Sequence, residues 1–246
     1  MTDKPCSVWI GFDERETAAF AVARHSAQRR MSVQLPIRGI VLDDLVARGL
    51  YRREVQERVG PNGAKVLWDP ISDAPMSTAF AISRFFLPFL AERGWAIFMD
   101  SDVLVRAPIN RLFDNLDDHY AVYCVKHPEM PDASGSKMSG QSQTAYKRKL
   151  WSSVVAWNVE HPAHKALTLS MLNSVPGRDL HRFSWLDDNA IGELGPEWNY
   201  LVGLSEEPAV TPRIAHFTLG VPTQEGCSNA PYADEWWSEL GLWARG

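Results

Sequence analysis

Two aspartates one residue apart follow directly on an apolar run, and this is where the sequence first indicates chemistry. The run is Trp95–Met99 (WAIFM) and the acids are Asp100 and Asp102. Unbroken apolar character over this length predicts a strand buried on both faces. Carboxylates at positions i and i+2 beyond its end can converge on one hard cation that prefers oxygen ligands. The alternative is a solvated loop that carries two acids.

The elements before this pair alternate between strand and helix patterns. Residues 7–12 (SVWIGF) predict a strand, and a helix is expected from Asp13, where apolar residues recur three and four positions apart. A second strand is expected at 33–37. A partly helical stretch is expected to continue through Val59.

A helix over residues 78–93 is expected to lead into the buried strand. Ser77 is expected to cap it and Pro88 to bend it. Its core-facing residues are expected to be Phe80, Phe86, Phe89 and Leu90. Further strands are expected at 120–125, 151–159 and 213–217, further helices at 164–173, 187–194 and 232–243, and a long polar loop at 128–149.

This alternation predicts an α/β fold, with a parallel sheet in the first half of the chain and mixed strands later. In open α/β sheets, ligands bind beyond the carboxyl ends of the strands. Gly11, Asp13, Asp100 and Asp102 would all lie at that edge.

Composition excludes several classes of protein. The 246 residues carry 25 Lys and Arg against 30 Asp and Glu, a net charge of −5, so no nucleic-acid partner is expected. The sequence has no signal core and no run near the ~20 apolar residues that a transmembrane segment needs, which predicts a cytoplasmic protein. Cys6, Cys124 and Cys227 lack C-x-x-C spacing and are expected to be reduced structural thiols.

Several motifs, in this order, resemble glycosyltransferase family 8, a GT-A fold family that uses nucleotide sugars. They are VWIGFDERE, STAFAISRFFLPFL leading to WAIFMDSDVLV, WLDDNAIGEL followed by PEWNYL, and IAHFTLGVP, and together they span residues 8–222. The resemblance implies a GT-A-like, Rossmann-like central sheet, mixed but mostly parallel, flanked by helices. It also implies a single domain over 1–246, with a nucleotide-binding half (1–125) and an acceptor-side half (126–246).

The resemblance implies a metal site at the acidic pair. Asp102 would be a metal ligand, and Asp100 would be a second ligand near the donor ribose. His216, followed by Phe217 and then Gly220, would be the third ligand. Two carboxylates and an imidazole suit manganese or magnesium bridging a diphosphate. The alternative for His216 is a histidine satisfied by hydrogen bonds at a strand end.

The resemblance also implies residues that bind the nucleotide. Gly11 and Phe12 would line the base and ribose, and Gly11 would let the ligand approach the backbone closely. Asp13 would bind the nucleotide or cap the first helix. Arg84 would reach the donor phosphates or the acidic pair, or form a structural salt bridge. Ser101 and Gly220 complete the expected nucleotide-binding set.

On the acceptor side, the resemblance implies that Asp187 and Asp188 are catalytic groups near the anomeric carbon. The family reads Asp-Gln-Asp and this chain reads Leu-Asp-Asp, so the acid that faces the sugar stays open, and one of the two can cap a helix. Trp157 and Asn158 replace a small-residue motif, which leaves the shape of the sugar pocket open.

The chain departs from the family after Gly220, where Val221-Pro222 stands in place of Lys-Pro-Trp. Basic residues of the polar loop could supply the missing diphosphate contact, or could simply be solvated: Lys137, Lys147, Arg148 and Lys149. Three C-terminal tryptophans could pack on the domain or meet an acceptor or a membrane surface: Trp236, Trp237 and Trp243.

The sequence therefore predicts a metal-dependent glycosyltransferase that moves a sugar from a nucleoside diphosphate sugar, expected to be a UDP-sugar, to the hydroxyl of a glycan, lipid or protein, with retention. A haloacid-dehalogenase-like phosphatase is one alternative, but there the acidic motif closes the first strand and a Thr or Val follows where this chain has Leu104. A nucleotide-sugar-binding module without turnover is the other.

Overall fold

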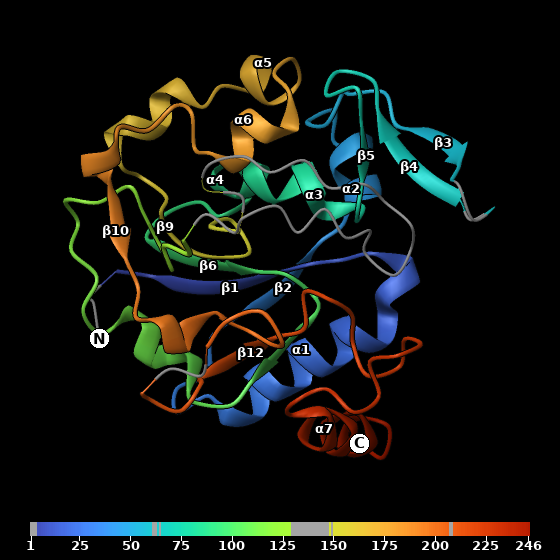
Figure 1. Ribbon diagram of the computed structural model, residues 1–246. Coiled ribbons are helices and arrows are strands. Elements are labelled where there is room, and N and C mark those ends of the chain that lie inside the picture. Colours follow the sequence, from blue (N-terminus) through green and yellow to red (C-terminus); the bar gives the residue numbers. More distant parts are fainter. Residues whose placement is uncertain (1–3, 61–62, 64, 129–147, 149, 207–208) are drawn as a thin grey trace.

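A six-stranded sheet runs through the centre of the computed structural model, which describes residues 4–60, 63, 65–128, 148, 150–206 and 209–246 (Figure 1). Its strand order is β10-β8-β9-β6-β1-β2. The strands are β1 (Cys6–Gly11), β2 (Ile37–Ile40), β6 (Trp95–Met99), β8 (Val122–Cys124), β9 (Val154–Asn158) and β10 (Ile191–Glu193). Strand β9 is antiparallel to β6 and β8, and the other pairings are parallel. The predicted α/β fold with a mixed, mostly parallel sheet is confirmed.

Helices cover both faces of this sheet. One face carries α1 (Thr17–Arg30), and the other carries the short helices α3, α4, α5 and α6 (Figure 1). Their bounds are α3 (Phe80–Ser83), α4 (Leu87–Leu90), α5 (Leu169–Leu172) and α6 (Gly177–His181). Ile97 of β6 packs into the hydrophobic cluster on the α1 side, and Phe98 packs into the cluster on the opposite side. Strand β6 is thus buried on both faces, as its apolar run predicts.

Two smaller sheets flank the central one. The first has the order β11-β12-β7, from β11 (Tyr200–Leu201), β12 (Ile214–His216) and β7 (Val103–Val105). The second has the order β3-β4-β5, from β3 (Gln56–Val59), β4 (Lys65–Asp69) and β5 (Ala74–Met76). Helix α2 spans Leu42–Ala47 and α7 spans Ala233–Trp243. The 3-10 turns are Glu14–Glu16, Arg84–Phe86, Ile109–Phe113, Pro162–Ala166, Asp188–Ala190 and Pro196–Trp198.

The helix predicted over residues 78–93 is broken into α3, a 3-10 turn and α4. Pro88 lies in the first turn of α4, where a missing N–H costs no hydrogen bond, so the break precedes the proline. Ser77 does not cap the helix. The Asp13 carboxylate instead accepts a hydrogen bond from the Ala79 amide at 2.8 Å. Phe89 is 36% exposed, so its expected core position is wrong.

Other sequence expectations are wrong where tertiary pairing overrides local pattern. The second strand lies at Ile37–Ile40 rather than 33–37, in register with β1, and the stretch through Val59 ends in strand β3. Residues 164–173 form a 3-10 turn and α5 rather than one helix. Residues 187–194 form a 3-10 turn and then β10, which pairs with β8.

Helix α7 packs against α1 through a buried carboxylate. Trp236 is fully buried there, as the packing interpretation predicts, while Trp237 and Trp243 are 44% and 50% exposed. Glu239 is 1% exposed and forms ion pairs with Arg29 and Arg30 of α1 at 2.9 and 2.8 Å. The three cysteines are free thiols, as expected. Within the described residues, no helix has the length and apolar character needed to cross a bilayer.

This carboxylate predicts a defined pH dependence of stability. Burial favours a raised pKa, but the hydrogen bonds from Arg29 and Arg30 outweigh it and lower the pKa of Glu239 to about 2. A depressed carboxyl pKa stabilises the fold above the unfolded-state pKa and loses that contribution as pH falls toward the folded value. We expect Glu239→Gln to lower the free energy of unfolding by about 2–3 kcal/mol at pH 6, with the difference from the native protein shrinking between pH 4.5 and pH 2.

Urea unfolding at pH 6, 4 and 3 measures this difference. Glu92→Gln, at an exposed position, is the control and is expected to change stability by less than about 0.5 kcal/mol at each pH. A deficit for Glu239→Gln that stays constant down to pH 3 would contradict the assignment of the pH dependence to Glu239.

Candidate active site

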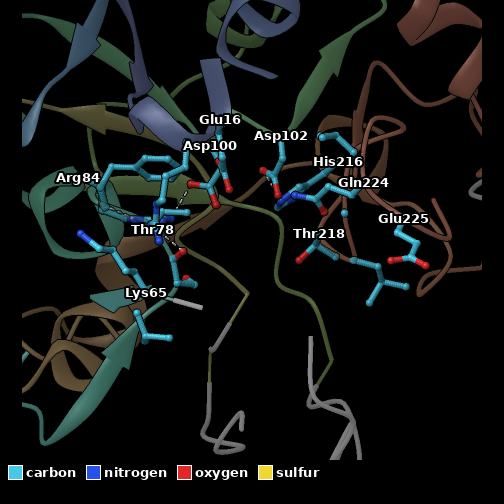
Figure 2. Close-up of a pocket in the computed structure, with 17 residues that line it drawn as sticks. Glu16, Lys65, Thr78, Arg84, Asp100, Asp102, His216, Thr218, Gln224 and Glu225 are labelled. Carbon is cyan, nitrogen blue, oxygen red and sulfur yellow. Dashed lines mark hydrogen bonds and ion pairs between the residues drawn. The ribbon is translucent and has the colours of Figure 1, made fainter. Parts of the chain in front are cut away.

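A cavity of about 440 Å³ opens beyond the carboxyl end of β6. Figure 2 shows Arg84, Thr78 and Lys65 on one side, Thr218, Gln224 and Glu225 on the other, and Glu16, Asp100, Asp102 and His216 between them. The cavity therefore lies at the sheet edge where the sequence predicts the ligand.

Asp100, Asp102 and His216 converge in this cavity, as predicted. One ligand atom from each residue lies within 4.8 Å of the other two. The second sheet brings them together, because β7 follows Asp102 directly and pairs antiparallel with β12, which ends in His216. The Phe217 amide also donates a hydrogen bond to the Asp102 carbonyl at 2.8 Å. Two carboxylates and one imidazole within reach of one point suit a divalent cation such as manganese or magnesium.

Arg84 reaches the acidic pair, which is one of the roles expected from sequence. Its side chain is 7% exposed and its Nη1 lies 2.7 Å from Asp100 Oδ1. Nη1 also donates to the Ser152 carbonyl at 3.0 Å. The guanidinium lies over the rings of Phe80 and Phe98, with its carbon 5.3 and 5.0 Å from their centroids. Arg84 is thereby held in one position, and it fixes the orientation of Asp100.

Glu16 adds a further carboxylate to the cavity, and the sequence interpretation missed it. Its Oε2 accepts a hydrogen bond from Ser101 Oγ at 2.7 Å. Burial, followed by the negative charge of Asp102, raises the pKa of Glu16 to about 7. Ser101 is fully buried and its hydroxyl donates to Glu16, a contact that steadies the acidic motif, and the expected nucleotide-binding role of Ser101 stays a prediction.

Gly11 is required by a close approach within the protein itself. A Cβ at this position would lie 2.4 Å from the ring of Phe80, which lines the cavity, and the expected role of Gly11 in binding the nucleotide stays a prediction. Phe12 packs edge-on against Phe20, with ring centroids 5.1 Å apart. Neither Gly11 nor Phe12 is among the cavity-lining residues that the structure describes.

Asp13 makes the capping contacts that were its alternative role. It is 1% exposed, and its carboxylate accepts hydrogen bonds from the Arg15 amide at 2.9 Å and from the Ala79 amide. It also forms an ion pair with Arg15 at 2.6 Å. Burial tends to raise the pKa of Asp13, but these hydrogen bonds outweigh it and lower it. Asp13 therefore ties the end of β1 to the start of α3, beneath the cavity wall.

The cavity has residues on its two walls that the sequence interpretation did not single out. Lys65 enters from β4, where it also pairs with Glu57 at 2.9 Å. Opposite it lie Thr218, Gln224 and Glu225 of the segment after β12. Gly220, which was predicted, also lines this wall. It has φ of +140°, and a Cβ there would lie 2.4 Å from Gln224 Oε1. Glycine is needed to form this wall.

Asp187 and Asp188 are not among the described residues that line the cavity. The Asp188 side chain is 87% exposed and pairs with Arg148. Asp187 occupies the cap position of a 3-10 turn, but its side chain makes no capping hydrogen bond. Their acceptor-side role stays a prediction. Lys137, Lys147 and Lys149 lie outside the described residues, so only Arg148 of the loop candidates is placed.

Trp157 does not border the cavity in the described part of the chain. It is 1% exposed and stacks on Trp185, with ring centroids 6.1 Å apart and an interplanar angle of 11°. Asn158 is buried as well and donates to the Asp118 carbonyl at 3.2 Å. The departure from the family's small-residue motif is therefore accommodated inside an aromatic core, away from the described lining of the cavity.

No family model matches the chain. Protein CDI of Arabidopsis thaliana is 37% identical to it over 242 residues, which cover 96% of this chain and 86% of that protein. The chain belongs to the Protein CDI family. Identity at this level over nearly the whole length means that the two proteins share one fold.

Solved structures of glycosyltransferases have the same fold. The galactosyltransferase LgtC, solved with donor and acceptor sugar analogs, has a TM-score of 0.60 and 15% identity, covering 96% of this chain and 95% of that one. Apo GlyE of Streptococcus pneumoniae has a TM-score of 0.59 and 13% identity. The match covers 98% of this chain and 61% of the GlyE chain. The bifunctional glycosyltransferase WbbM has a TM-score of 0.56 and 14% identity. The match covers 97% of this chain and 52% of the WbbM chain. The predicted GT-A fold is confirmed.

Proposed function

We propose that the protein is a metal-dependent glycosyltransferase that takes a UDP-sugar and passes the sugar, with retention, to the hydroxyl of a glycan, lipid or protein acceptor. The observation that carries the proposal is the group of Asp100, Asp102 and His216 in a cavity at the carboxyl end of β6. The GT-A fold supports it, since LgtC with the same fold was solved with donor and acceptor sugar analogs.

Asp100, Asp102 and His216 would hold manganese or magnesium. When bound there, the cation supplies positive charge that stabilises the departing nucleoside diphosphate. Arg84 keeps Asp100 in one orientation through the 2.7 Å ion pair. The donor would lie in this cavity, with its diphosphate between Lys65 and the segment after β12. Fixed placement of donor and acceptor lowers the barrier by removing the entropy of their encounter.

Lys65 is our candidate for the diphosphate contact that the missing Lys-Pro-Trp motif leaves open. It comes from the β4 strand of the small sheet and not from the C-terminal segment. Its side chain is 80% exposed, so the ammonium group can leave Glu57 for a phosphate oxygen at little cost. Asp187 and Asp188 remain the proposed catalytic groups on the acceptor side.

The phosphatase alternative fits the site less well. In such an enzyme the acidic motif closes the first strand of the sheet. Here the first strand, β1, ends in Gly11, and Asp100 instead follows β6.

The proposal is tested by thermal unfolding with nucleoside diphosphates and nucleotide sugars, each with and without manganese. We expect UDP or a UDP-sugar to raise the melting temperature only when manganese is present. At a ligand concentration of 100 times Kd the stabilisation is about 2.7 kcal/mol, which corresponds to a shift of about 5–10 °C. No response to any nucleotide would contradict the proposal. Binding without sugar release or transfer across an acceptor panel would indicate the non-catalytic binding module.

A further inference from the structure

A buried amide contacts the histidine of the candidate metal site from behind. Asn199 is 0% exposed, and its Oδ1 lies 3.0 Å from Nδ1 of His216. Its Nδ2 donates to Ser153 Oγ at 2.9 Å. The Ser153 hydroxyl in turn donates to the Leu150 carbonyl at 3.0 Å. These contacts form one chain of hydrogen bonds from the backbone to the imidazole.

The direction of this chain determines which nitrogen of His216 carries the hydrogen. A serine hydroxyl has one hydrogen, and here the Leu150 carbonyl receives it. Ser153 Oγ can therefore only accept from Asn199, so the Asn199 amide nitrogen faces Ser153 and its carbonyl oxygen faces His216. A carbonyl oxygen only accepts, so the hydrogen lies on Nδ1 of His216. In a neutral imidazole, the ring lone pair then lies on Nε2.

That lone pair is directed to the acidic group. Nε2 of His216 lies 3.1 Å from Asp102 Oδ1. A nitrogen lone pair and a carboxylate oxygen at this distance repel each other unless a proton or a metal cation lies between them, so Nε2 faces Asp102 as a site for positive charge. We propose that Asn199 is a positioning residue that holds His216 as the Nδ1-protonated tautomer and so presents Nε2 to a divalent cation shared with Asp102. This inference rests on the metal dependence in the proposed function and assigns a residue that the site's own lining does not include.

The backbone brings these side chains together without help from the amide. Asn199 immediately precedes β11, which pairs parallel with β12 so that Leu201 lies opposite His216. The Val202 amide donates to the His216 carbonyl at 2.9 Å. Because backbone hydrogen bonds fix the two strands, a change of the Asn199 side chain should alter the imidazole without displacing its strand.

Two substitutions of similar size show whether Asn199 acts by accepting the Nδ1 hydrogen of His216 or only by filling space. Asn199→Leu fills the space but removes the acceptor, and Asn199→Asp keeps an acceptor oxygen toward Nδ1. Binding is measured with manganese alone, from the electron paramagnetic resonance signal of free Mn²⁺. We expect Asn199→Leu to weaken manganese binding about 10–100-fold, and Asn199→Asp to remain within about threefold of native. Asn110→Leu is the control, since Asn110 is equally buried but bonds to Ser32 and Val33.

The tautomer is read directly from the ¹⁵N chemical shifts of the His216 ring in metal-free protein. We expect a protonated Nδ1 in the native protein whatever the state of Nε2, and in Asn199→Leu a population with the hydrogen on Nε2 and none on Nδ1. An unprotonated Nδ1 in the native protein, or native manganese affinity in Asn199→Leu, would overturn the inference. Both readouts need no nucleotide. A native protein that binds manganese through His216 but no nucleotide would therefore contradict the proposed function and leave this inference standing.

Discussion

Asp102→Asn is expected to abolish the manganese-dependent stabilisation by UDP while leaving the metal-free protein as stable as the native one. Asparagine keeps the size of the side chain and removes its charge, so a divalent cation loses one of two carboxylate ligands. We expect manganese affinity to fall at least about 100-fold, and sugar transfer with it.

The stability of the metal-free variant follows from the contacts of Asp102. Its carbonyl, which accepts from the Phe217 amide, is unchanged by the substitution, so β7 and β12 stay paired. Burial is the largest cause of the raised pKa of Glu16, and repulsion by the Asp102 carboxylate is the second. The substitution removes this repulsion. The metal-free melting temperature should therefore stay level or rise slightly.

Differential scanning fluorimetry with and without manganese and UDP measures both effects. Asp43→Asn, an exposed substitution on α2 with the same change of charge, is the control and should keep the full nucleotide response. An unchanged manganese-dependent shift in Asp102→Asn would contradict the assignment of Asp102 as a ligand.

The parts of the site that could be predicted from sequence are those whose signal is local. Asp100 and Asp102 follow an apolar run whose length and composition require a central strand, and that strand places them at the ligand edge whatever the rest of the chain does. His216 was found through the resemblance of its motif, since one histidine at a strand end carries no signal of its own.

The parts that were missed depend on contacts between residues far apart in the chain. Glu16 meets Ser101 across 85 positions, and nothing near Glu16 in the sequence indicates that partner. Asn199 contacts Ser153 across 46 positions. Lys65 reaches the cavity because three short strands form a separate sheet, whereas the sequence suggested partly helical structure before them.

Gly11 shows how much a sequence can indicate about a close approach to the backbone. Glycine at the end of the first strand indicated a close approach, but sequence does not name what approaches. Phe80 does so in this chain, because Asp13 caps the start of α3 and places this aromatic ring over the glycine. The Phe80 ring also lies against the Arg84 guanidinium, which pairs with Asp100. The end of the first strand is thus connected to the acidic pair through Phe80 and Arg84.

Arg84→Met is expected to lower both stability and sugar transfer. Methionine retains the apolar stem between Phe80 and Phe98, but it leaves Asp100 and the Ser152 carbonyl without their cationic donor. Breaking a buried ion pair from one side costs about 3–5 kcal/mol of unfolding free energy. Without the 2.7 Å contact Asp100 can rotate, and displacement of a positioning group by about 1 Å costs about 100-fold in rate.

Manganese provides the decisive comparison for this variant, because a bound cation can take over the charge compensation of Asp100. We expect manganese to recover part of the stability that Arg84→Met loses, as measured by urea unfolding, while transfer stays impaired because the orientation of Asp100 is not restored. Arg84→Lys should be intermediate, since an ammonium group cannot match the two-directional contacts of the guanidinium. Arg52→Met, at an exposed position, is the control. Full transfer activity in Arg84→Met would contradict the role of Arg84 in orienting Asp100, and the absence of any manganese rescue would show that Asp100 does not share a cation site with Asp102 and His216.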